Sequence, residues 1–424
     1  MKIRPASLPR RKTGFSLIEL MVAMILGLLV SAGIVALFTT TSRTNLVQNG
    51  LARMQENGRY VISRIASDLR MTSAQYCSNT SVGDAVSTPN GVQAPLRAPM
   101  LHIRNFTFPD WSGGNLSGGA SVALSPRYFM QGYDCDGSGC RPATPSVPTT
   151  IPVPGTADGN RVRGSDVLTV RYLRNPGWFV SRCDFASKAM TVAPDALSTP
   201  LSVRNGDAVL VSDCSNANVF TAQVAGNVIT PSSLATGAEI RCPASASIND
   251  PRVVDGDPRL FNFTKDFVSV TYYLKVRTDG DPDHPGRVVP VLMRRESDGE
   301  GGMREQEIAE GVERLDFLYG VEDAAGRIAF LNAGEVQGFT NCPAAPSGVA
   351  VEAGCGWRSV KSIEVHLLLN TVGDVGVAEV DTSYRYGIDG PEIRTPPATL
   401  PSGLPAGRMM RREFVAQVTA RNFR

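Results

Sequence analysis

The feature that most constrains this chain is an unbroken apolar run close to its N-terminus. Phe15 to Phe38 are 24 consecutive positions with a single charged side chain, Glu19. At about 1.5 Å per residue, a helix of this length measures about 36 Å, enough to cross a hydrocarbon core of roughly 30 Å. Residues 1–14 before it hold five basic and no acidic residues. The pattern predicts a single membrane-spanning helix with a cytoplasmic N-terminus and an exported body.

Two ordinary kinds of N-terminal segment, a cleaved secretory signal and a signal anchor, could explain the apolar run. A cleaved secretory signal has a basic start, but its apolar part is usually 7 to 15 residues long, so this run is too long. An ordinary signal anchor fits the length. It leaves Glu19 unexplained, because a lone carboxylate in lipid costs at least about 2.5 kcal/mol and usually has a functional partner.

The residues around the start of the run resemble a known processing motif. Lys12 to Leu20 read KTGFSLIEL, which is similar to the motif of type IV prepilins. The resemblance implies that a prepilin peptidase cuts after Gly14 and methylates Phe15, the new first residue. A glycine before the cut places no side chain in the way of the peptidase. Glu19, the fifth mature residue, then becomes the assembly residue, because its carboxylate can meet the charged amine of a neighbouring Phe15 in a low dielectric.

The helix is expected to continue beyond the membrane. No proline interrupts the chain until Pro89, and apolar residues recur along one helical face. These residues are Val47, Leu51, Met54, Val61, Ile65 and Leu69. We therefore predict one helix from Phe15 to Met71, about 85 Å long, whose second half packs on a globular domain.

Composition and patterning divide the rest of the chain. Residues 80–165 hold 12 Gly and 10 Pro, which predicts a loop-rich insertion with few strands. Alternating or apolar segments bounded by turns indicate antiparallel strands later in the chain. They are Asp166–Leu173, Asp207–Val211, Asn218–Val224, Phe267–Val276, Val288–Arg294, Val360–Leu369 and Glu413–Arg421. Arg304 to Tyr319 is read as a short helix followed by a strand at Leu315–Tyr319.

The expected fold class is α+β and pilin-like, with a long N-terminal helix packed on an antiparallel β-sheet that carries loop-rich insertions. The predicted organisation has five parts. They are a cleaved basic leader at 1–14, a transmembrane half-helix at 15–38, an amphipathic half-helix at 39–79, the Gly/Pro-rich insertion at 80–165 and a β-rich globular domain at 166–424.

Several C-terminal segments narrow the resemblance to one family. Residues 206–220, 292–297, 308–323, 357–371 and 410–424 are similar in type and order to the PilW-type minor pilins of Gram-negative type IV pili. This resemblance implies a non-enzymatic protein of pilus biogenesis that primes assembly at the pilus tip, in filaments serving adhesion, twitching motility and DNA uptake. A J-type minor pseudopilin of type II secretion is the neighbouring alternative. A signal-anchored periplasmic enzyme or binding protein is the more distant one.

The resemblance also implies partners and a location. The partners are the prepilin peptidase, other minor pilins, the major pilin and a tip adhesin. The chain would lie in the inner membrane as a single-pass protein with a periplasmic domain, and then in the pilus at the cell surface. Nucleic acid is not an expected partner, because the chain is close to neutral, with 42 Lys and Arg against 40 Asp and Glu. We read the C-terminal arginines, Arg408, Arg411, Arg412, Arg421 and Arg424, as a strand face that pairs with neighbouring subunits.

Eight cysteines are expected to form disulfides, because an exported domain lies in an oxidising compartment. Eight cysteines allow 105 pairings, so connectivity stays open. Proximity in sequence favours Cys135–Cys140, Cys183–Cys214 and Cys342–Cys355, which leaves Cys77 with Cys242.

No metal, cofactor or catalytic motif is expected. The acidic turns at 134–137, 255–257 and 279–283 have oxygen ligands of the type that calcium uses, but none completes a twelve-residue calcium loop. They are read as solvated turns. The sequence lacks H-E-x-x-H, G-x-S-x-G, S-x-x-K and phosphate-loop patterns. His102, His284 and His366 are read as structural or surface residues.

Overall fold

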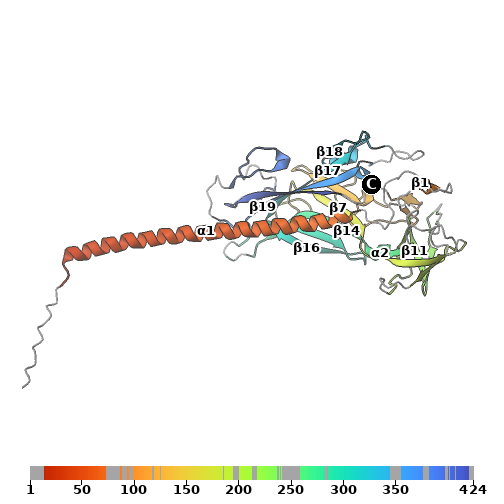
Figure 1. Cartoon of the computed structure of the whole chain (residues 1–424), viewed down its shortest axis with the longest axis horizontal. Helices are drawn as coiled ribbons and strands as arrows, with labels where there is room; N and C mark the ends of the chain where they lie inside the picture. The colour runs from red at the N-terminus through yellow and green to blue at the C-terminus, as the bar shows by residue number, and fades with distance from the viewer. Residues whose placement is uncertain are drawn as a thin grey trace, which may run out of the picture.

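A computed structural model of the chain describes residues 14–72, 86–87, 93–94, 99–116, 119–124, 126–184, 186–193, 200–212, 217–235, 238, 240, 258–280, 282, 285–343, 355–375, 382–396, 400, 402–405 and 407–419. Figure 1 shows a globular body from which one long helix projects. The chain is α+β, as predicted. Its helix α1 spans Leu17–Met71, within two residues of the predicted start and at the predicted end.

The second half of α1 lies between two β-sheets and shares one apolar core with them. The six-stranded sheet has the order β16-β15-β14-β7-β5-β6, and the four-stranded sheet has the order β18-β17-β19-β20. The strands of the first sheet are β16 (Met303–Glu310), β15 (Val288–Ser297), β14 (Phe267–Thr278), β7 (Val167–Leu173), β5 (Met130–Cys135) and β6 (Cys140–Arg141). Those of the second are β18 (Ile328–Leu331), β17 (Val312–Glu322), β19 (Val360–Asn370) and β20 (Arg411–Thr419). All the pairings in both sheets are antiparallel.

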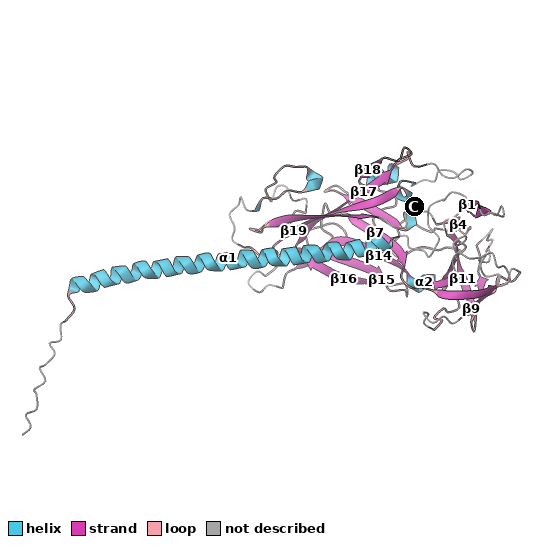
Figure 2. Cartoon of the chain, in the orientation of Figure 1, coloured by secondary structure: helices cyan, strands magenta, loops and turns pink. Residues whose placement is uncertain are grey.

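A third sheet, of eight strands, builds a separate unit at the end of the body far from the start of α1 (Figure 2). Its order is β10-β13-β8-β9-β12-β11-β3-β4, and β10 also pairs with β11. Six of its strands therefore close on themselves, which leaves them no free edge. One apolar core belongs to this sheet alone and includes Trp178, Phe220 and Leu260. A second core is shared with the six-stranded sheet through Leu173 and Phe267. The strands are β10 (Ala208–Ser212), β13 (Arg259–Asn262), β8 (Trp178–Cys183), β9 (Met190–Ala193), β12 (Val228–Ser232), β11 (Ala217–Ala225), β3 (Met100–Leu101) and β4 (Val122–Ala123).

Short elements complete the described fold. Two of them form a two-stranded pair, β1 (Val86–Ser87) and β2 (Gln93–Ala94). The others are the helices α2 (Phe263–Asp266), α3 (Ala333–Gly338) and α4 (Cys355–Arg358), with single 3-10 turns at Pro126–Tyr128 and Gly387–Asp389.

The strand predictions are confirmed at all seven places, where β7, β10, β11, β14, β15, β19 and β20 lie. The short helix predicted within Arg304 to Tyr319 is wrong. Residues 303–310 form the strand β16 instead, because they pair with β15 along seven residue positions, and this pairing outweighs the helix propensity of a Glu- and Gln-rich segment.

The Gly/Pro-rich stretch 80–165 contributes more to the core than its composition indicates. Within it, β5 pairs with β7 in the six-stranded sheet, and Tyr133 of β5 is buried. The carboxylate of Asp166, which directly follows the stretch, accepts hydrogen bonds from the backbone N–H groups of Cys135 and Phe317, both at 2.9 Å. Asp166 therefore links the six-stranded sheet to β17 of the four-stranded sheet.

Candidate functional site on the long helix

The start of α1 is fixed by a reciprocal pair of side chains. Ser16 caps the helix, and its Oγ accepts a hydrogen bond from the backbone N–H of Glu19 at 3.1 Å. The Glu19 carboxylate in turn accepts from the backbone N–H of Ser16 at 3.2 Å and from its hydroxyl at 3.3 Å. This capping box satisfies two donors that a helix end leaves free. The negative charge of Glu19 also lies at the positive end of the helix dipole.

The residues on either side of the predicted cut are open to solvent in the single chain. Phe15 is 89% exposed. A Cβ at Gly14 would have no atom within 4 Å. The fold itself therefore places no steric demand for glycine at Gly14, and any such demand must come from what binds this segment.

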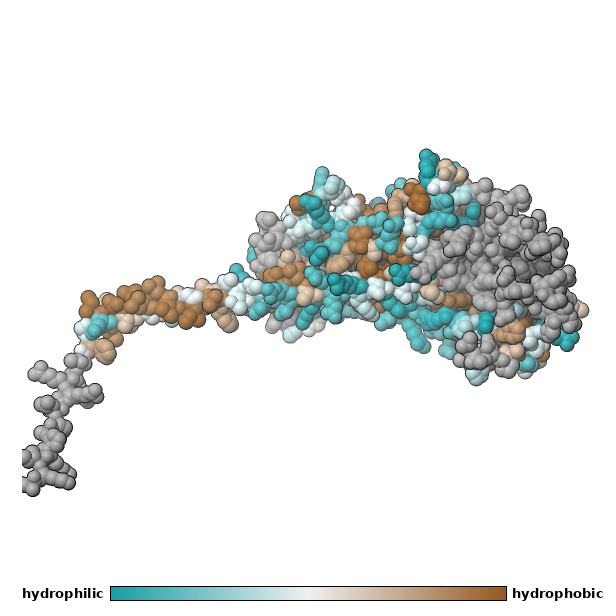
Figure 3. All heavy atoms as spheres, viewed as in Figure 1, coloured by the Kyte–Doolittle hydropathy of each residue, from teal (hydrophilic) through white to brown (hydrophobic). Residues whose placement is uncertain are grey.

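The first half of α1 has no partner in the single chain. Every residue from Leu17 to Leu46 is exposed, including the large apolar side chains Leu28 and Phe38. Figure 3 shows this half as a continuous apolar rod that turns polar where it reaches the body. Among the described residues, α1 is the one helix long and apolar enough to cross a membrane.

The second half of α1 buries one face. Met54, Val61, Ile65 and Leu69 are buried in the core that the helix shares with both sheets, whereas Val47 and Leu51 are partly exposed. This is the face that the apolar spacing predicts.

Gly58 allows the helix to lie directly on β20. A Cβ at Gly58 would stand 2.5 Å from the ring of Phe414, well inside van der Waals contact. The close approach brings the second half of α1 and the last strand together.

One buried carboxylate locks the end of α1 to the six-stranded sheet. Asp68 receives an ion pair from Nε of Arg294 at 2.7 Å. It also accepts hydrogen bonds from the hydroxyls of Tyr172 and Tyr272, at 2.9 and 2.6 Å. Both charged side chains are at most 5% exposed. The network therefore joins the helix to β7, β14 and β15 in a single cluster.

The electrostatics of this cluster keep its donors protonated. Burial and then the neighbouring Asp68 raise the pKa of Tyr172 to about 12, and they raise the pKa of Tyr272 further. The pKa of Arg294 is raised as well. Burial, the largest single influence, acts against this shift, and the hydrogen bond and charge of Asp68 together with the hydrogen bond to Glu296 outweigh it. Arg294 also pairs with Glu296, so its remaining donors are directed toward a second carboxylate.

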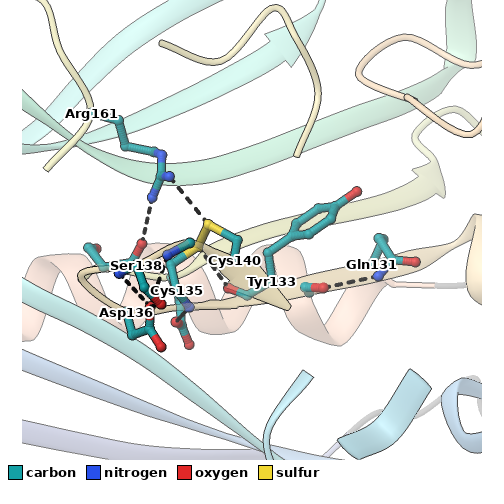
Figure 4. The surroundings of a disulfide bond; sticks show 11 residues. Gln131, Tyr133, Cys135, Asp136, Ser138, Cys140 and Arg161 are labelled. Atoms are coloured by element: carbon teal, nitrogen blue, oxygen red, sulfur yellow. Dashed lines mark hydrogen bonds between the residues drawn. A yellow bond between two sulfur atoms is a disulfide. The ribbon is translucent and has the colours of Figure 1, made fainter. Parts of the chain in front are cut away.

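The described cysteines are all oxidised. Cys135 is bonded to Cys140, and Cys342 to Cys355, two of the pairs that proximity in sequence favours. Cys183 is disulfide-bonded too. In Figure 4, Nη2 of Arg161 approaches the sulfur of Cys140 at 3.3 Å. The other predicted disulfide residues, Cys77, Cys214 and Cys242, lie outside the described residues.

The acidic turns hold their charges with local donors where they are described. Asp136 accepts from Ser138 and Gly139, and Asp279 pairs with Arg287. The turn at 255–257 and most of 281–284 lie outside the described part of the chain. Within that part, no group of three or more His, Cys, Asp or Glu side chains is placed to hold a metal ion.

The described histidines and Arg411 are buried among polar partners. His102 contacts Ser121 and Asn218, and Nδ1 of His366 lies 2.8 Å from Glu413. Arg411 is buried and forms a bidentate ion pair with Glu313. The prediction that the C-terminal arginines form one face open to neighbouring subunits is therefore wrong for this residue. Arg421 lies outside the described residues, as does Arg424.

The roles of Ser16 and Asp68 are not predicted by the sequence analysis. Ser16 and Glu19 show the S-x-x-E spacing of a capping box, a signal that is present in the sequence. Asp68 falls on the apolar face of the helix beside Ile65 and Leu69, and a carboxylate on such a face requires a buried partner.

Comparison with known proteins matches two parts of the chain. Residues 271–422 match the family model of the type IV pilus-assembly protein W. Residues 9–35 match the prokaryotic N-terminal methylation motif. The resemblance stated from the sequence is thus confirmed. No curated protein and no solved structure gives a significant match.

Proposed function

We propose that this chain, a type IV pilus-related minor pilin by its PilW-type region and its methylation motif, primes pilus assembly and lies at the pilus tip. The observation that carries the proposal is the joint presence of the two matches on one chain, with the motif at the start of an exposed apolar helix. The filament would serve adhesion, twitching motility and DNA uptake.

The motif implies processing by a prepilin peptidase. We place the cut after Gly14, at the cytoplasmic face of the membrane, with the body in the periplasm. The exposed, unpacked backbone around Gly14 suits a segment that a peptidase must enter. Cleavage there leaves the whole of α1 on the product, so the subunit stays anchored until neighbours replace the lipid around its first half.

Glu19 would then exchange partners during assembly. In the single chain its carboxylate is satisfied by Ser16. Cleavage creates a charged amine at Phe15, and a neighbouring amine of this kind in a low dielectric is a stronger partner for a carboxylate than a hydroxyl is. The capping box lowers the cost of carrying Glu19 in lipid before that neighbour arrives.

The chain acts as a structural subunit in this proposal and not as an enzyme. Its partners would be the peptidase, the other minor pilins, the major pilin and a tip adhesin. The tightly anchored second half of α1 supports this role, because a force on the apolar half passes directly through Asp68 and the shared core into both sheets.

The test is the count of sheared surface pili in a deletion strain complemented with the wild-type gene or with Glu19→Ala. We expect the deletion to lose most pili, the wild type to restore them and Glu19→Ala to restore few, with its N-terminus still processed. Glu392→Ala, which removes an exposed carboxylate outside α1, is the matched control and should restore pili fully. Normal piliation in the deletion strain, with exoproteins held in the periplasm, would instead assign the chain to type II secretion.

A further inference from the structure

We propose that Cys140 is a site of thiol–disulfide exchange, at which a dithiol reductant opens the Cys135–Cys140 disulfide while Cys342–Cys355 stays closed. The inference is independent of the proposed pilus function. It rests on the buried guanidinium of Arg161, which points at the sulfur of Cys140 (Figure 4).

Arg161 is an unusual buried cation. It is only 4% exposed, yet among the described residues it forms no ion pair. Its Nη1 donates to the carbonyl oxygen of Ser165 at 3.0 Å and its Nη2 to the sulfur of Cys140 at 3.3 Å. Its Nε has no hydrogen-bond partner in the described part of the chain. Arginine is almost never fully buried without an anionic partner, so this site lacks one negative charge.

The fold holds this guanidinium in place. The backbone N–H of Arg161 donates to the carbonyl of Val153 at 3.0 Å, and its carbonyl accepts from the N–H of Gly155 at 2.9 Å. Arg161 also forms a β-bridge with Lys275 of β14. Burial lowers the pKa of Arg161, and the charge of Asp166 opposes this shift without cancelling it. The positive charge is therefore poorly compensated while the sulfur beside it is neutral.

Reduction gives a partner to each of the two sulfurs. A thiolate at Cys140 forms a charge-assisted pair with Arg161, because a neighbouring guanidinium favours the ionised form of a thiol. Sγ of Cys135 lies 3.7 Å from the carbonyl oxygen of Tyr133, so a neutral thiol at this position has an acceptor. A disulfide whose reduced form is stabilised in this way is easier to reduce.

The carboxylates near the β5–β6 hairpin do not take the place of this thiolate. Asp136 accepts three hydrogen bonds from its own turn, and the two oxygens of Asp166 each accept a backbone N–H. Arg141 partly offsets the charge of Asp134. Arg161 is thus left facing the sulfur of Cys140.

Exposure and loop length also distinguish the two disulfides. Cys135 is 5% exposed, whereas Cys140 is partly exposed after an open turn, so an incoming thiolate reaches Cys140 first. The Cys135–Cys140 pair spans 5 positions of sequence and the Cys342–Cys355 pair 13, and the shorter loop gives less stabilisation. Sγ of Cys355 faces the carbonyl oxygen of Phe339 at 3.5 Å, which disfavours a thiolate there.

The exchange consists of two displacements. A thiolate of the reductant attacks Sγ of Cys140, the S–S bond breaks, and its electron pair leaves on Sγ of Cys135, which takes a proton from water. The second thiolate of the reductant then attacks its own sulfur in the mixed disulfide, and Cys140 leaves as a thiolate beside Arg161. The dithiol, having lost both protons to water, is oxidised by two electrons to a disulfide, and β6 loses its covalent link to β5.

The first experiment compares the two disulfides within the wild-type chain. The full chain, purified in detergent, is equilibrated with mixtures of reduced and oxidised dithiothreitol, and acid quenching, alkylation and mass spectrometry give the reduced fraction of each cysteine. We expect Cys135 and Cys140 to be half reduced in a mixture about tenfold more oxidising than Cys342 and Cys355 require, which is about 30 mV for a two-electron couple. Glutathione, a monothiol, should be trapped on Cys140.

The second experiment changes the cation. Arg161→Gln should make the Cys135–Cys140 pair about tenfold harder to reduce, and Arg161→Lys should retain most of the wild-type behaviour, because one unit of thiol pKa is a factor of ten. Arg141→Gln removes an exposed charge next to Cys140 and is the matched control, with a change of less than about twofold. The melting temperature of each oxidised variant shows whether it is folded.

The reduced chain provides a separate readout. The rate at which iodoacetamide alkylates Cys140 should rise with a midpoint pH below about 8.5, the ordinary value for a thiol, and this midpoint should be higher in Arg161→Gln. Equal reduction of the two disulfides in the wild-type chain would overturn the inference without any variant. A Cys140 midpoint at the ordinary value, or glutathione trapped on Cys135, would overturn it as well.

Discussion

The two halves of α1 are one unbroken helix with opposite relations to the body. The first half is the more apolar and is entirely exposed, whereas the second half is mostly polar and buries Val61, Ile65 and Leu69 in the shared core. Total hydrophobicity therefore does not decide which half packs on the domain. The period of the apolar positions does, because only a one-sided stripe can be covered by two sheets while the other side faces water.

The largest expected effect comes from breaking the buried anchor of the second half. Asp68→Ala should lower the free energy of unfolding by about 3–5 kcal/mol, because Arg294 and two tyrosine hydroxyls lose their buried acceptor. The measurement is thermal or urea unfolding of the full chain in detergent. Glu56→Ala, on the outer face of the same helix, should change stability by less than about 0.5 kcal/mol, and equal losses in the two variants would remove Asp68 from its anchoring role.

Truncating an isoleucine in each half compares the halves directly. Ile65→Ala should cost about 2–5 kcal/mol in the same unfolding measurement, because Ile65 is fully buried and its loss leaves a cavity. Ile25→Ala should cost less than about 0.5 kcal/mol, because Ile25 is 58% exposed. Similar costs at both positions would show that the first half packs against the body after all.

Adding a methyl group at a glycine in each half gives a smaller contrast. Gly58→Ala should lose about 1 kcal/mol net, since overpacking against Phe414 costs about 1–3 kcal/mol and the gain in helix propensity returns about 1. Gly27→Ala has no atom within 4 Å of the new Cβ and should leave the unfolding of the body unchanged. In a background with Phe414→Ala, Gly58→Ala should become neutral or stabilising, and a persistent loss would point to another contact.

The smallest effect is expected at the capping box. Ser16→Ala should weaken the helix start by about 1 kcal/mol and leave the melting temperature of the body within error, as should Glu19→Ala. Both residues lie in the half of α1 that makes no contact with the sheets. A shift of several degrees in either variant would mean that the N-terminal end of α1 stabilises the body.

The sequence predicts the helix and its buried face well, because a stripe such as Val61, Ile65 and Leu69 repeats with the helical period over many turns. It predicts long strands such as β19 for the same kind of reason. It does not predict β16, whose strand state depends on pairing with β15. Nor does it predict the eight-stranded sheet, in which six of the strands are only two to five residues long. The partner of Asp68 is also beyond local patterns, because Arg294 lies 226 positions away.

The candidate site likewise has features that the sequence predicts and features that only the fold shows. The processing motif and the capping box are short and contiguous, so residues such as Gly14 and Glu19 can be read from the sequence. The cysteine pairs close in sequence can be proposed from proximity alone, as with Cys342 and Cys355.

The central claim is that the apolar half of α1 is delivered by prepilin processing as the assembly arm of a pilus subunit. Mass spectrometry of the N-terminus of the mature protein, purified from its own membrane, tests this claim most directly. We predict a chain that begins at Phe15 and carries a methyl group on its amino nitrogen. An intact Met1, or a first residue beyond Phe38, would contradict the claim.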